Sequence, residues 1–314
     1  MTVIAQFHGL ERVALPASPV HLAVGIFDGV HLGHRAVIEG AVQSARRSSG
    51  VSAVLTFSPH PSVLFNPGDP VRLILDLPAK IARLASLGVE AVVVQPFTAA
   101  FAATTAEEFL PLIKRHIPGL AGLYVGENFR FGRGRRGDVA MLIAEAKQLG
   151  ITVLSAPRVN LDGEPISSTR IRERIRSGDM KGAAALLGYA YAAEGIVVHG
   201  KHLGRTLGFP TLNLGWSPDL RPLYGVYAVR VSGPKSYGWH PAVANYGLRP
   251  TVEESQEPRL EIHMLAGCPY AAGDHVCVEW IRFLRPERKF SGLEELKAQI
   301  ARDVAQARAE FSLP

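Results

Sequence analysis

The sequence predicts two domains: an N-terminal α/β domain with a doubly wound parallel sheet, and a C-terminal antiparallel β-barrel with a terminal helix. Up to residue 187, apolar runs of strand length alternate with stretches of helical period, joined by short connections. Beyond it, short alternating strands are separated by Gly and Pro turns. We therefore expect residues 1–186 to form one domain and residues 187–314 the other, a division that the length of 314 residues also favours.

In the first domain, an apolar run over residues 21–27 predicts the first strand, and helical spacing from His34 predicts the first helix. Glycines at the ends of several elements mark stops. Further strands are expected at residues 51–57, 89–97, 120–126 and 151–156. Further helices are expected at residues 78–87, 106–116, 138–149 and 170–177.

In the second domain, period-two stretches predict the strands of a small barrel. These strands are expected at residues 192–198, 225–231, 242–246, 259–265 and 275–283. A helix over residues 293–310 closes the chain, and Ser291 and Glu294 have the spacing of a capping box at its start.

Composition narrows the class of function. The chain is 47% hydrophobic and 20% charged, without an apolar run long enough to span a bilayer or a signal-peptide pattern. Cys268 and Cys277 are too far apart for a CxxC pair, so we expect neither a disulfide framework nor a thiolate zinc site. The net charge of +6 fits small polyanions better than a nucleic acid, because no basic tail is present. We expect a cytoplasmic protein with no membrane or nucleic-acid partner and at most weak self-association.

The string GIFDGVHLGH, residues 25–34, is the feature around which the chain is organised. It has the pattern of a strand, a tight turn and a helix N-terminus, which presents backbone N–H groups and a positive dipole end to an anion. His31 and His34 flank Gly33, where a phosphate could approach the backbone, and their imidazoles could donate hydrogen bonds to it. The alternative is a chance HxGH with solvated histidines.

Three other segments of this domain carry polar groups suited to the same ligand. In SPHPSVLF, two prolines flank His60 and predict an irregular loop beside the ligand crevice, although a purely structural histidine is the commoner case. GENFRFGRGRRGD, residues 126–138, contains GxGxxG, but it lacks the strand context of a dinucleotide site and instead predicts a mobile basic loop for phosphate. Ser167, Ser168 and Thr169 precede the helix with Arg170 and Arg172, which is more donors than a cap needs.

The second domain has its own phosphate pattern in HGKHLGRTLGFPTLNL, residues 199–214. Its glycines allow a wrapping loop, and Thr211 and Asn213 would lie on one side of a strand, an arrangement that suits a hydrated Mg²⁺. No GxxxxGK[ST] occurs, so this is not a P-loop. Glu261 and His263 share one face of the strand at 259–265, where a solvent-facing carboxylate is the alternative to a catalytic one.

The HxGH string resembles the signature of the nucleotidyltransferase superfamily, with its Rossmann-like α/β fold, and FDGVH resembles its flavin-adenylylating branch. The whole chain resembles the prokaryotic bifunctional riboflavin kinase/FAD synthetase family. The resemblance implies that His31 and His34 hold ATP phosphates in FMN adenylylation and that His60 and Asn128 lie near the flavin. It also implies a set of nucleotide-binding residues, which are Gly25, Phe27, Asp28, Gly33, Ser167, Ser168, Thr169 and Arg172.

The C-terminal half resembles the riboflavin kinase barrel through GRTLGFPTLN, ANYGLRPT, LEIHM and LRPERKF. The resemblance implies that Thr211 and Asn213 bind Mg²⁺, Glu261 is the base for the ribityl hydroxyl, and Arg285 contacts the flavin. The ATP loop would include Gly204, Arg205, Gly208 and Pro210. The family usually follows the E-x-H strand with Asp-Phe and a Leu-Tyr-Gly turn, whereas this chain has AGCPYA at residues 266–271.

The implied function is two successive phosphate transfers from ATP, riboflavin to FMN and then FMN to FAD with release of pyrophosphate, without a protein nucleophile. Three alternatives stay open: an FAD synthetase with weak or lost kinase activity, a flavin- or nucleotide-binding regulator with dead sites, and an aminoacyl-tRNA synthetase-like adenylator. The last lacks its lysine-rich second signature in this chain.

Overall fold

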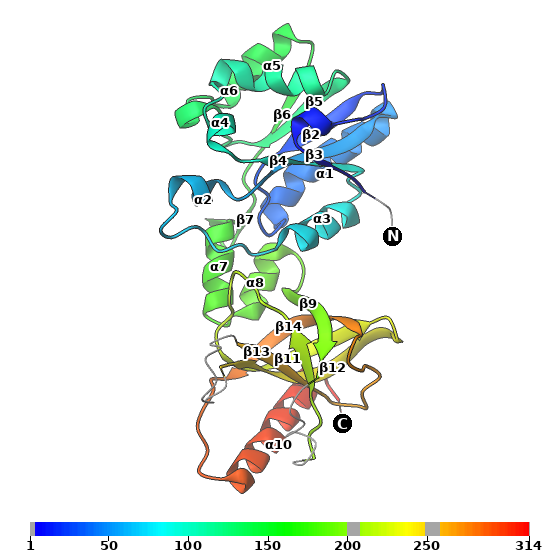
Figure 1. Cartoon of the computed structure of the whole chain (residues 1–314), viewed down its shortest axis with the longest axis vertical. Helices are drawn as coiled ribbons and strands as arrows, with labels where there is room; N and C mark the ends of the chain where they lie inside the picture. The colour runs from blue at the N-terminus through cyan, green and yellow to red at the C-terminus, as the bar shows by residue number, and fades with distance from the viewer. Residues whose placement is uncertain (1–3, 200–207, 249–257, 314) are drawn as a thin grey trace. The chain divides into compact units, whose positions relative to one another are not determined.

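A computed structural model of the chain describes residues 4–199, 208–248 and 258–313. It divides into two compact units, Met1–Ser168 and Thr169–Pro314 (Figure 1). Two helices lie between the end of the first unit and the predicted boundary at residue 187. They are α7 (Ser168–Arg176) and α8 (Met180–Leu187). They fall almost entirely in the second unit, and the division at residue 187 stays a prediction.

The first unit is built on a six-stranded sheet in which all neighbouring strands are parallel. The strand order is β1-β4-β3-β2-β5-β6. The strands are β1 (Ala5–His8), β2 (Val20–Val24), β3 (Val51–Ser58), β4 (Ala91–Pro96), β5 (Leu120–Gly126) and β6 (Thr152–Ala156). The predicted parallel sheet is confirmed, with the edge strand β1 as an addition that its exposed AQFH sequence did not indicate.

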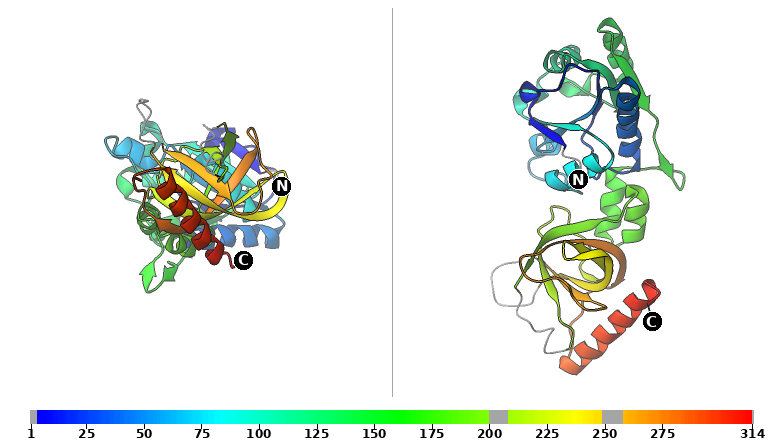
Figure 2. Two further views of the ribbon diagram at one scale, coloured as in Figure 1. Left: turned by 90° about the horizontal axis from the view of Figure 1, so that it is seen from below. Right: turned by 90° about the vertical axis from the view of Figure 1, so that its right-hand side faces the viewer.

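Helices cover both faces of this sheet (Figure 2). α1 (Leu32–Ser48) and α3 (Leu77–Ser86) pack over one face with Ala23 and Val54. α5 (Ala106–His116) and α6 (Val139–Gln148) pack over the other with Leu22 and Leu55. Neighbouring residues of one strand thus enter opposite cores, as the period of two requires. Shorter elements are η1 (Leu10–Arg12), α4 (Ala99–Ala102), η2 (Arg133–Arg135), β7 (Asn160–Leu161) and β8 (Glu164–Pro165).

Three details predicted at helix starts are wrong, although the predicted bounds of the C-terminal helix α10, 293–310, are confirmed. α1 begins at Leu32 rather than His34, because His31 is its N-cap. The segment after His60 is not an irregular loop: Pro61 opens a short helix, α2 (Pro61–Phe65), with His60 as its N-cap. At the C-terminal helix, Ser291 bonds to Glu295 rather than Glu294, so the predicted capping box does not form.

The order of strands in the sheet locates a crevice. Strands run outward from β2 to β3 and β4 on one side, and from β5 to β6 on the other. The connections leave β2 and β5 in opposite directions, which opens a ligand crevice at their carboxyl ends. The residues that follow β2 are those of the GIFDGVHLGH string.

The second unit is a closed antiparallel barrel in the order β10-β13-β12-β11-β14-β9, with α10 (Leu293–Glu310) packed against its outer face. The predicted barrel and terminal helix are confirmed. The barrel interior holds aromatic rings in edge-to-face contact, with Trp280 centred 4.7 Å from Tyr227 and 5.6 Å from Tyr246. The strands are β9 (Ala192–Val198), β10 (Leu212–Gly215), β11 (Gly225–Gly233), β12 (Ser236–Gly247), β13 (Arg259–Met264) and β14 (His275–Arg285).

None of the helices in the described ranges combines the length and apolar composition that crossing a membrane requires.

The attachment of α7 and α8 to the barrel generates a prediction. Ile175 accepts a backbone hydrogen bond from Leu223, Lys181 pairs with Glu310 at 2.7 Å, and α8 packs on β14. We expect a fragment of residues 169–314 to unfold at a temperature at least about 5 °C above a fragment of residues 187–314, because the shorter one loses these contacts. Thermal unfolding by circular dichroism measures the difference, and equal midpoints would contradict it.

Candidate active sites

The β2–α1 junction forms the first candidate site. His31 caps α1, and its Nδ1 accepts the backbone N–H of His34 at 3.3 Å. A neutral ring that accepts at Nδ1 carries its proton on Nε2, so Nε2 is the donor of His31. The His31 and His34 rings stack with centroids 3.5 Å apart and planes 18° apart. The two imidazoles therefore form one rigid unit at the helix N-terminus.

Two glycines of this string make room for side chains. A Cβ on Gly33 would lie 3.2 Å from Cε1 of His31, and a Cβ on Gly25 would lie 2.9 Å from the ring of Phe27. Gly33 was predicted to admit a phosphate, but the space beside its Cα is taken by the His31 ring. Its first role is therefore to let that ring lie against α1.

The turn between β2 and α1 is strained. Phe27 and Val30 are both buried and have φ values of 49° and 37°, which side-chain-bearing residues rarely adopt. Asp28, which is 2% exposed, accepts the backbone N–H of Ile74 at 3.0 and 3.2 Å, and its carbonyl accepts the hydroxyl of Ser168 at 2.9 Å. Asp28 and Ser168 thus hold the shape of the turn.

The first turn of α1 has free donors. Within the described ranges, the N–H groups of Leu32 and Gly33 make no hydrogen bond. Such groups at a helix start point outward along the axis and favour an anion. An ATP phosphate is the anion that would fit them.

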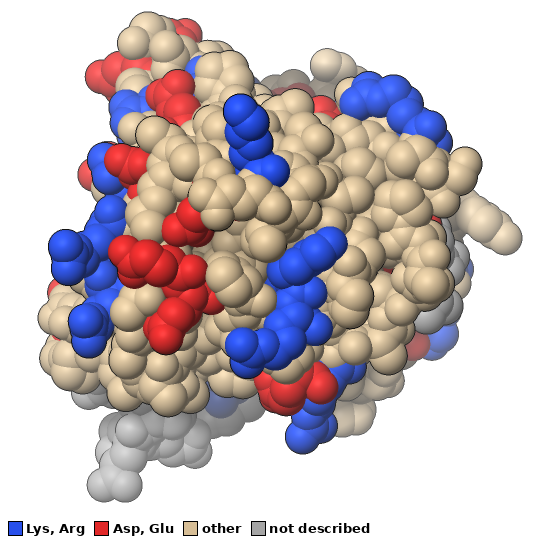
Figure 3. All heavy atoms as spheres, turned by 90° about the horizontal axis from the view of Figure 1, so that it is seen from above, with Lys and Arg blue, Asp and Glu red and all other residues tan. Residues whose placement is uncertain are grey.

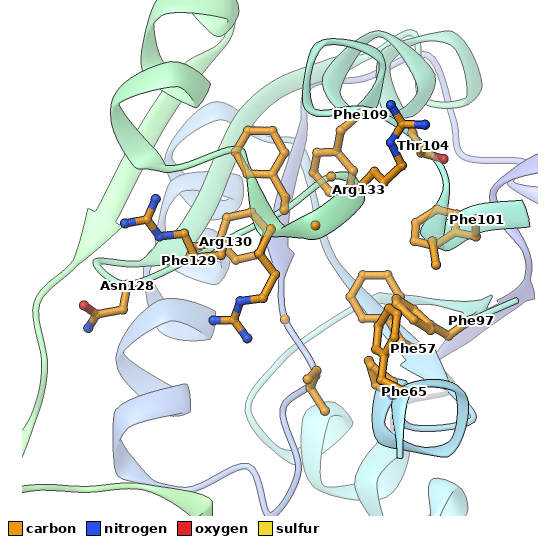
Figure 4. Close-up of a pocket in the computed structure, with 18 of the residues that line it drawn as sticks. Phe57, Phe65, Phe97, Phe101, Thr104, Phe109, Asn128, Phe129, Arg130 and Arg133 are labelled. Atoms are coloured by element: carbon orange, nitrogen blue, oxygen red, sulfur yellow. The ribbon is translucent and has the colours of Figure 1, made fainter. Parts of the chain in front are cut away.

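A cavity of about 820 Å³ lies beside this junction, which is within the range of roughly 300–1,000 Å³ usual for small-molecule sites. His34 lines it, together with Gly25 and Ile26, so the cavity and the HxGH string share one wall. Seven phenylalanines give the cavity an aromatic wall (Figure 4), and these are Phe57, Phe65, Phe97, Phe101, Phe109, Phe129 and Phe131. A flat, largely apolar ring system would fit this wall.

The cavity lining also includes polar and cationic side chains (Figure 4). Among them are Asn128, Arg130, Arg133 and Arg135, all from the predicted basic loop. The loop is held in place by the Phe131–Gly137 bridge and by a hydrogen bond from the Arg133 N–H to the Thr104 carbonyl at 2.7 Å. A cavity that joins an aromatic wall, cationic side chains and the start of α1 suits an aromatic ligand that carries a phosphate.

The other predicted residues of the first site do not line the cavity. His60 does not line the cavity but caps α2, whose Pro61 does, and its Nδ1 contacts the Ser62 hydroxyl at 2.8 Å. Ser167 precedes α7, and Thr169 and Arg172 continue it in the second unit. Their part in nucleotide binding stays a prediction.

The second candidate site is a row of polar residues across three strands of the barrel. The register places Glu261 of β13 directly opposite Asn213 of β10 on one side and Asn245 of β12 on the other, so the three side chains share one face. Asn213 is 8% exposed, and its Oδ1 is buried without a hydrogen-bond donor among the described residues. A buried unpaired acceptor is costly, so a cation bound at Oδ1 would satisfy it.

The approach to this row is partly described. The Nδ1–H of His263 donates a hydrogen bond to the Pro210 carbonyl at 2.9 Å, which holds the segment from Gly208 to Thr211 beside β13. Gly204 and Arg205 lie outside the described residues. The described residues include no group of three His, Cys, Asp or Glu placed to hold a metal ion.

Arg285, predicted to contact the flavin, is engaged elsewhere. Its Nε and Nη2 donate to the two carboxylate oxygens of Asp303 at 2.9 and 2.8 Å, and Asp303 is 3% exposed. This bidentate pair joins β14 to α10. A flavin contact of Arg285 stays a prediction.

The atypical loop at residues 266–271 lies at the end of the barrel that also carries Gly208–Thr211, as the antiparallel pairing of β10 with β13 requires. Tyr270 is 5% exposed and anchors the loop, since its hydroxyl bonds to the Ser236 hydroxyl at 2.8 Å. The effect of the loop on flavin affinity stays a prediction.

Surface charge gives no further site on the face shown in Figure 3. Basic and acidic side chains are interspersed there, so the net charge of +6 is not gathered on that face.

Comparisons with known proteins match both parts of the chain. A family model for FAD synthetase matches residues 16–170, and one for riboflavin kinase matches residues 187–311. The bifunctional riboflavin kinase/FMN adenylyltransferase of Escherichia coli (strain K12) is 38% identical, over 100% of this chain and 99% of that protein. The enzyme of the same description from Listeria monocytogenes is 37% identical, over 93% of this chain and 92% of that protein.

Among solved structures, a Streptococcus pneumoniae protein described as a macrolide-efflux protein has a TM-score of 0.86 and 29% identity. The alignment covers 98% of this chain and 99% of that one. The likeness extends over both units of the fold.

The Arg285–Asp303 pair yields a stability prediction. Arg285→Met would leave the buried Asp303 carboxylate without its cation, and we expect the free energy of unfolding of the second unit to fall by about 3 kcal/mol. Arg282→Met, on the same strand, removes an exposed pair with Glu310 and should cost less than about 1 kcal/mol. Urea unfolding of the two variants gives both values, and equal losses would contradict the assignment.

Proposed function

The chain belongs to the family of bifunctional riboflavin kinase/FMN adenylyltransferases, and from this membership we propose how its residues divide the work. The protein is a transferase that phosphorylates riboflavin to FMN in its C-terminal half and adenylylates FMN to FAD in its N-terminal half. The residue roles in both halves are our proposal.

For adenylyl transfer, the carrying observation is that His34 lines the aromatic cavity and stacks on His31 at the N-terminus of α1. The isoalloxazine ring would lie against the phenylalanines, which places the FMN phosphate toward His34 and Asn128. An oxygen of that phosphate attacks the α-phosphorus of ATP, the bond from the α-phosphorus to the bridging oxygen breaks, and pyrophosphate leaves.

The protein would stabilise this step by charge and position alone. Negative charge grows on the phosphate oxygens, and donors that are already in place lower its energy without reorganising. Those donors are His31 Nε2, His34 and the first N–H groups of α1, with Ser167, Ser168, Thr169 and Arg172 on the triphosphate. Asp28 would act indirectly, because its carboxylate already binds the backbone of Ile74.

For the kinase step, Glu261 would take the proton of the terminal ribityl hydroxyl as its oxygen attacks the γ-phosphorus of ATP, and ADP leaves. Glu261 stands in one row with Asn213, which places the carboxylate beside the proposed ATP loop. Most of the acceleration in such a reaction comes from positioning and from neutralising charge.

ATP is the phosphate donor of the family's reactions, and we propose Mg²⁺ as its partner ion. The unpaired Oδ1 of Asn213 is an oxygen ligand of the kind that Mg²⁺ prefers, with Thr211 two residues before it. Mg²⁺ commonly takes only one or two protein oxygens and completes its shell with water and phosphate. When bound, it would neutralise phosphate charge.

We propose riboflavin, FMN, FAD and ATP as the ligands of this chain. We also propose the cytoplasm as its location, where the free thiols of Cys268 and Cys277 would stay reduced. Incubation with riboflavin, ATP and Mg²⁺, followed by chromatography of the flavins, tests the whole proposal: FMN and FAD should both accumulate.

Substitution of the two histidines separates the sites. We expect His31→Ala combined with His34→Ala to lower FAD formation from added FMN by about 100-fold or more, because transition-state donors are lost. FMN formation from riboflavin should stay near normal. His116→Ala, at the end of α5 and outside the cavity wall, is the matched control. Equal loss of both activities in the double variant would contradict the two-site assignment.

Glu261→Gln tests the proposed base. The amide is nearly isosteric with the carboxylate but accepts no proton, so kcat for FMN formation should fall by about 100-fold or more with little change in the KM for ATP. FAD formation from added FMN should be unaffected. Glu279→Gln, which alters a barrel carboxylate paired with Arg230, serves as the control. An unchanged kcat in Glu261→Gln would exclude Glu261 as the base.

A further inference from the structure

One buried cation lies directly beneath the β2–α1 turn. Lys80 of α3 is 4% exposed, and its Nζ donates to the Ile26 carbonyl at 3.0 Å and approaches Thr56 Oγ1 at 3.5 Å. The Thr56 hydroxyl donates to the same carbonyl at 2.9 Å. The Ile26 carbonyl therefore accepts two hydrogen bonds from the interior of the first unit.

Because the peptide group is planar, the hydrogen bonds that fix the Ile26 carbonyl also fix the direction of the next backbone N–H. In a trans peptide, the carbonyl of one residue and the N–H of the next point in opposite directions. Because the Ile26 carbonyl faces Lys80, the N–H of Phe27 faces away from it. Within the described ranges, this N–H makes no hydrogen bond, while Gly25 and Ile26 line the cavity. Lys80 thus sets the direction of a peptide at the cavity wall.

Packing alone does not account for a lysine at this position. Its neighbours on the same face of α3, Ile81 and Leu84, are apolar and buried, and a methionine would fill similar volume without a charge. Burial lowers the pKa of Lys80, and the nearby Asp28 carboxylate acts in the opposite sense. Burying the Lys80 ammonium costs stability, so its position suggests a role other than stabilising the fold.

We propose that Lys80 is a positioning residue for adenylyl transfer: it holds the Ile26–Phe27 peptide and the strained turn that follows, so that His31 and α1 meet the phosphates correctly. The inference rests on the proposed function of this site. Lys80 touches no substrate, and it acts through the backbone. Misplacement of reacting groups by about 1 Å can cost up to about 100-fold in rate.

The test uses the full-length protein and two activities measured in one preparation. For Lys80→Met, we expect kcat for FAD formation from added FMN and ATP to fall by about 10- to 100-fold, with KM for FMN changed far less. FMN formation from riboflavin should be unchanged, since the second unit carries it. Lys80→Arg, which keeps a charged donor, should recover part of the lost kcat.

Leu84→Ala is the matched control, because Leu84 is fully buried one turn further along the same helix and its loss weakens the same core. Thermal unfolding compares the two variants. If Leu84→Ala is destabilised as much as Lys80→Met and loses as much FAD formation, Lys80 acts through stability alone and the inference is wrong. Full kcat in a folded Lys80→Met would overturn it equally.

A further variant tests the inference if the Lys80→Met protein does not fold. Thr56→Val removes the other donor to the Ile26 carbonyl with almost the same shape, and we expect a smaller fall of kcat for FAD formation. An unchanged kcat there, together with an unfolded Lys80→Met, counts against the inference. The two-histidine variant separates the hypotheses: if it keeps FAD formation, the proposed site fails, whereas loss there with full activity in Lys80→Met refutes the role of Lys80 alone.

Discussion

The adenylylating half depends on the turn between β2 and α1, where two residues adopt backbone conformations that are unfavourable for them. Phe27 and Val30 have positive φ values, at a cost on the order of 1–3 kcal/mol each. Hydrogen bonds from Thr56, Lys80 and Ser168, and those that Asp28 accepts, offset that strain. The donors come from β3, α3, the segment before α3 and the first residue of α7. Because the turn connects β2 directly to α1, the direction of the α1 N-terminus and the placement of the two stacked imidazoles both depend on it.

The two proposed phosphate sites are built differently. The first presents N–H groups and imidazoles at the start of a helix, where the carboxyl ends of parallel strands open a crevice. The second uses the cross-strand register, which places Asn213, Glu261 and Asn245 in one row. In a closed barrel this register is fixed around the whole circumference, so the row is rigid without the help of a strained backbone. The buried Arg285–Asp303 pair then holds α10 onto the same barrel.

The sequence predicted elements best where a single period continues without interruption. The helix at 106–116 and the strand at 120–126 match in the structure to the residue. The start of α1 was misplaced because the His31 side chain caps it, and at the C-terminal helix the bounds 293–310 match although the predicted Ser291–Glu294 capping box does not form. The strand β10 has only four residues, too few to show an alternating pattern. It was expected only through the spacing of Thr211 and Asn213, and it begins after Thr211, at Leu212. The aromatic cavity was missed because Phe57 lies at the end of β3 whereas Phe97 and Phe101 follow β4, and only the parallel order brings these strand ends together.

Buried polar side chains indicate functional positions that sequence motifs do not reveal. A polar side chain taken out of water is costly unless it is bonded, so its position needs a reason. The described residues include few such buried groups, and most of them lie at the two candidate sites: Asp28, His31, Thr56 and Lys80 at the turn, and Asn213 in the barrel. Another is Asp303 of α10, which pairs with Arg285. Of these, Thr56, Lys80 and Asp303 belong to none of the recognised strings. The recognised sequence strings indicate the groups proposed to face the substrate, whereas buried polar residues indicate the groups that hold them in place. Both are needed to explain why the HxGH histidines lie where they do.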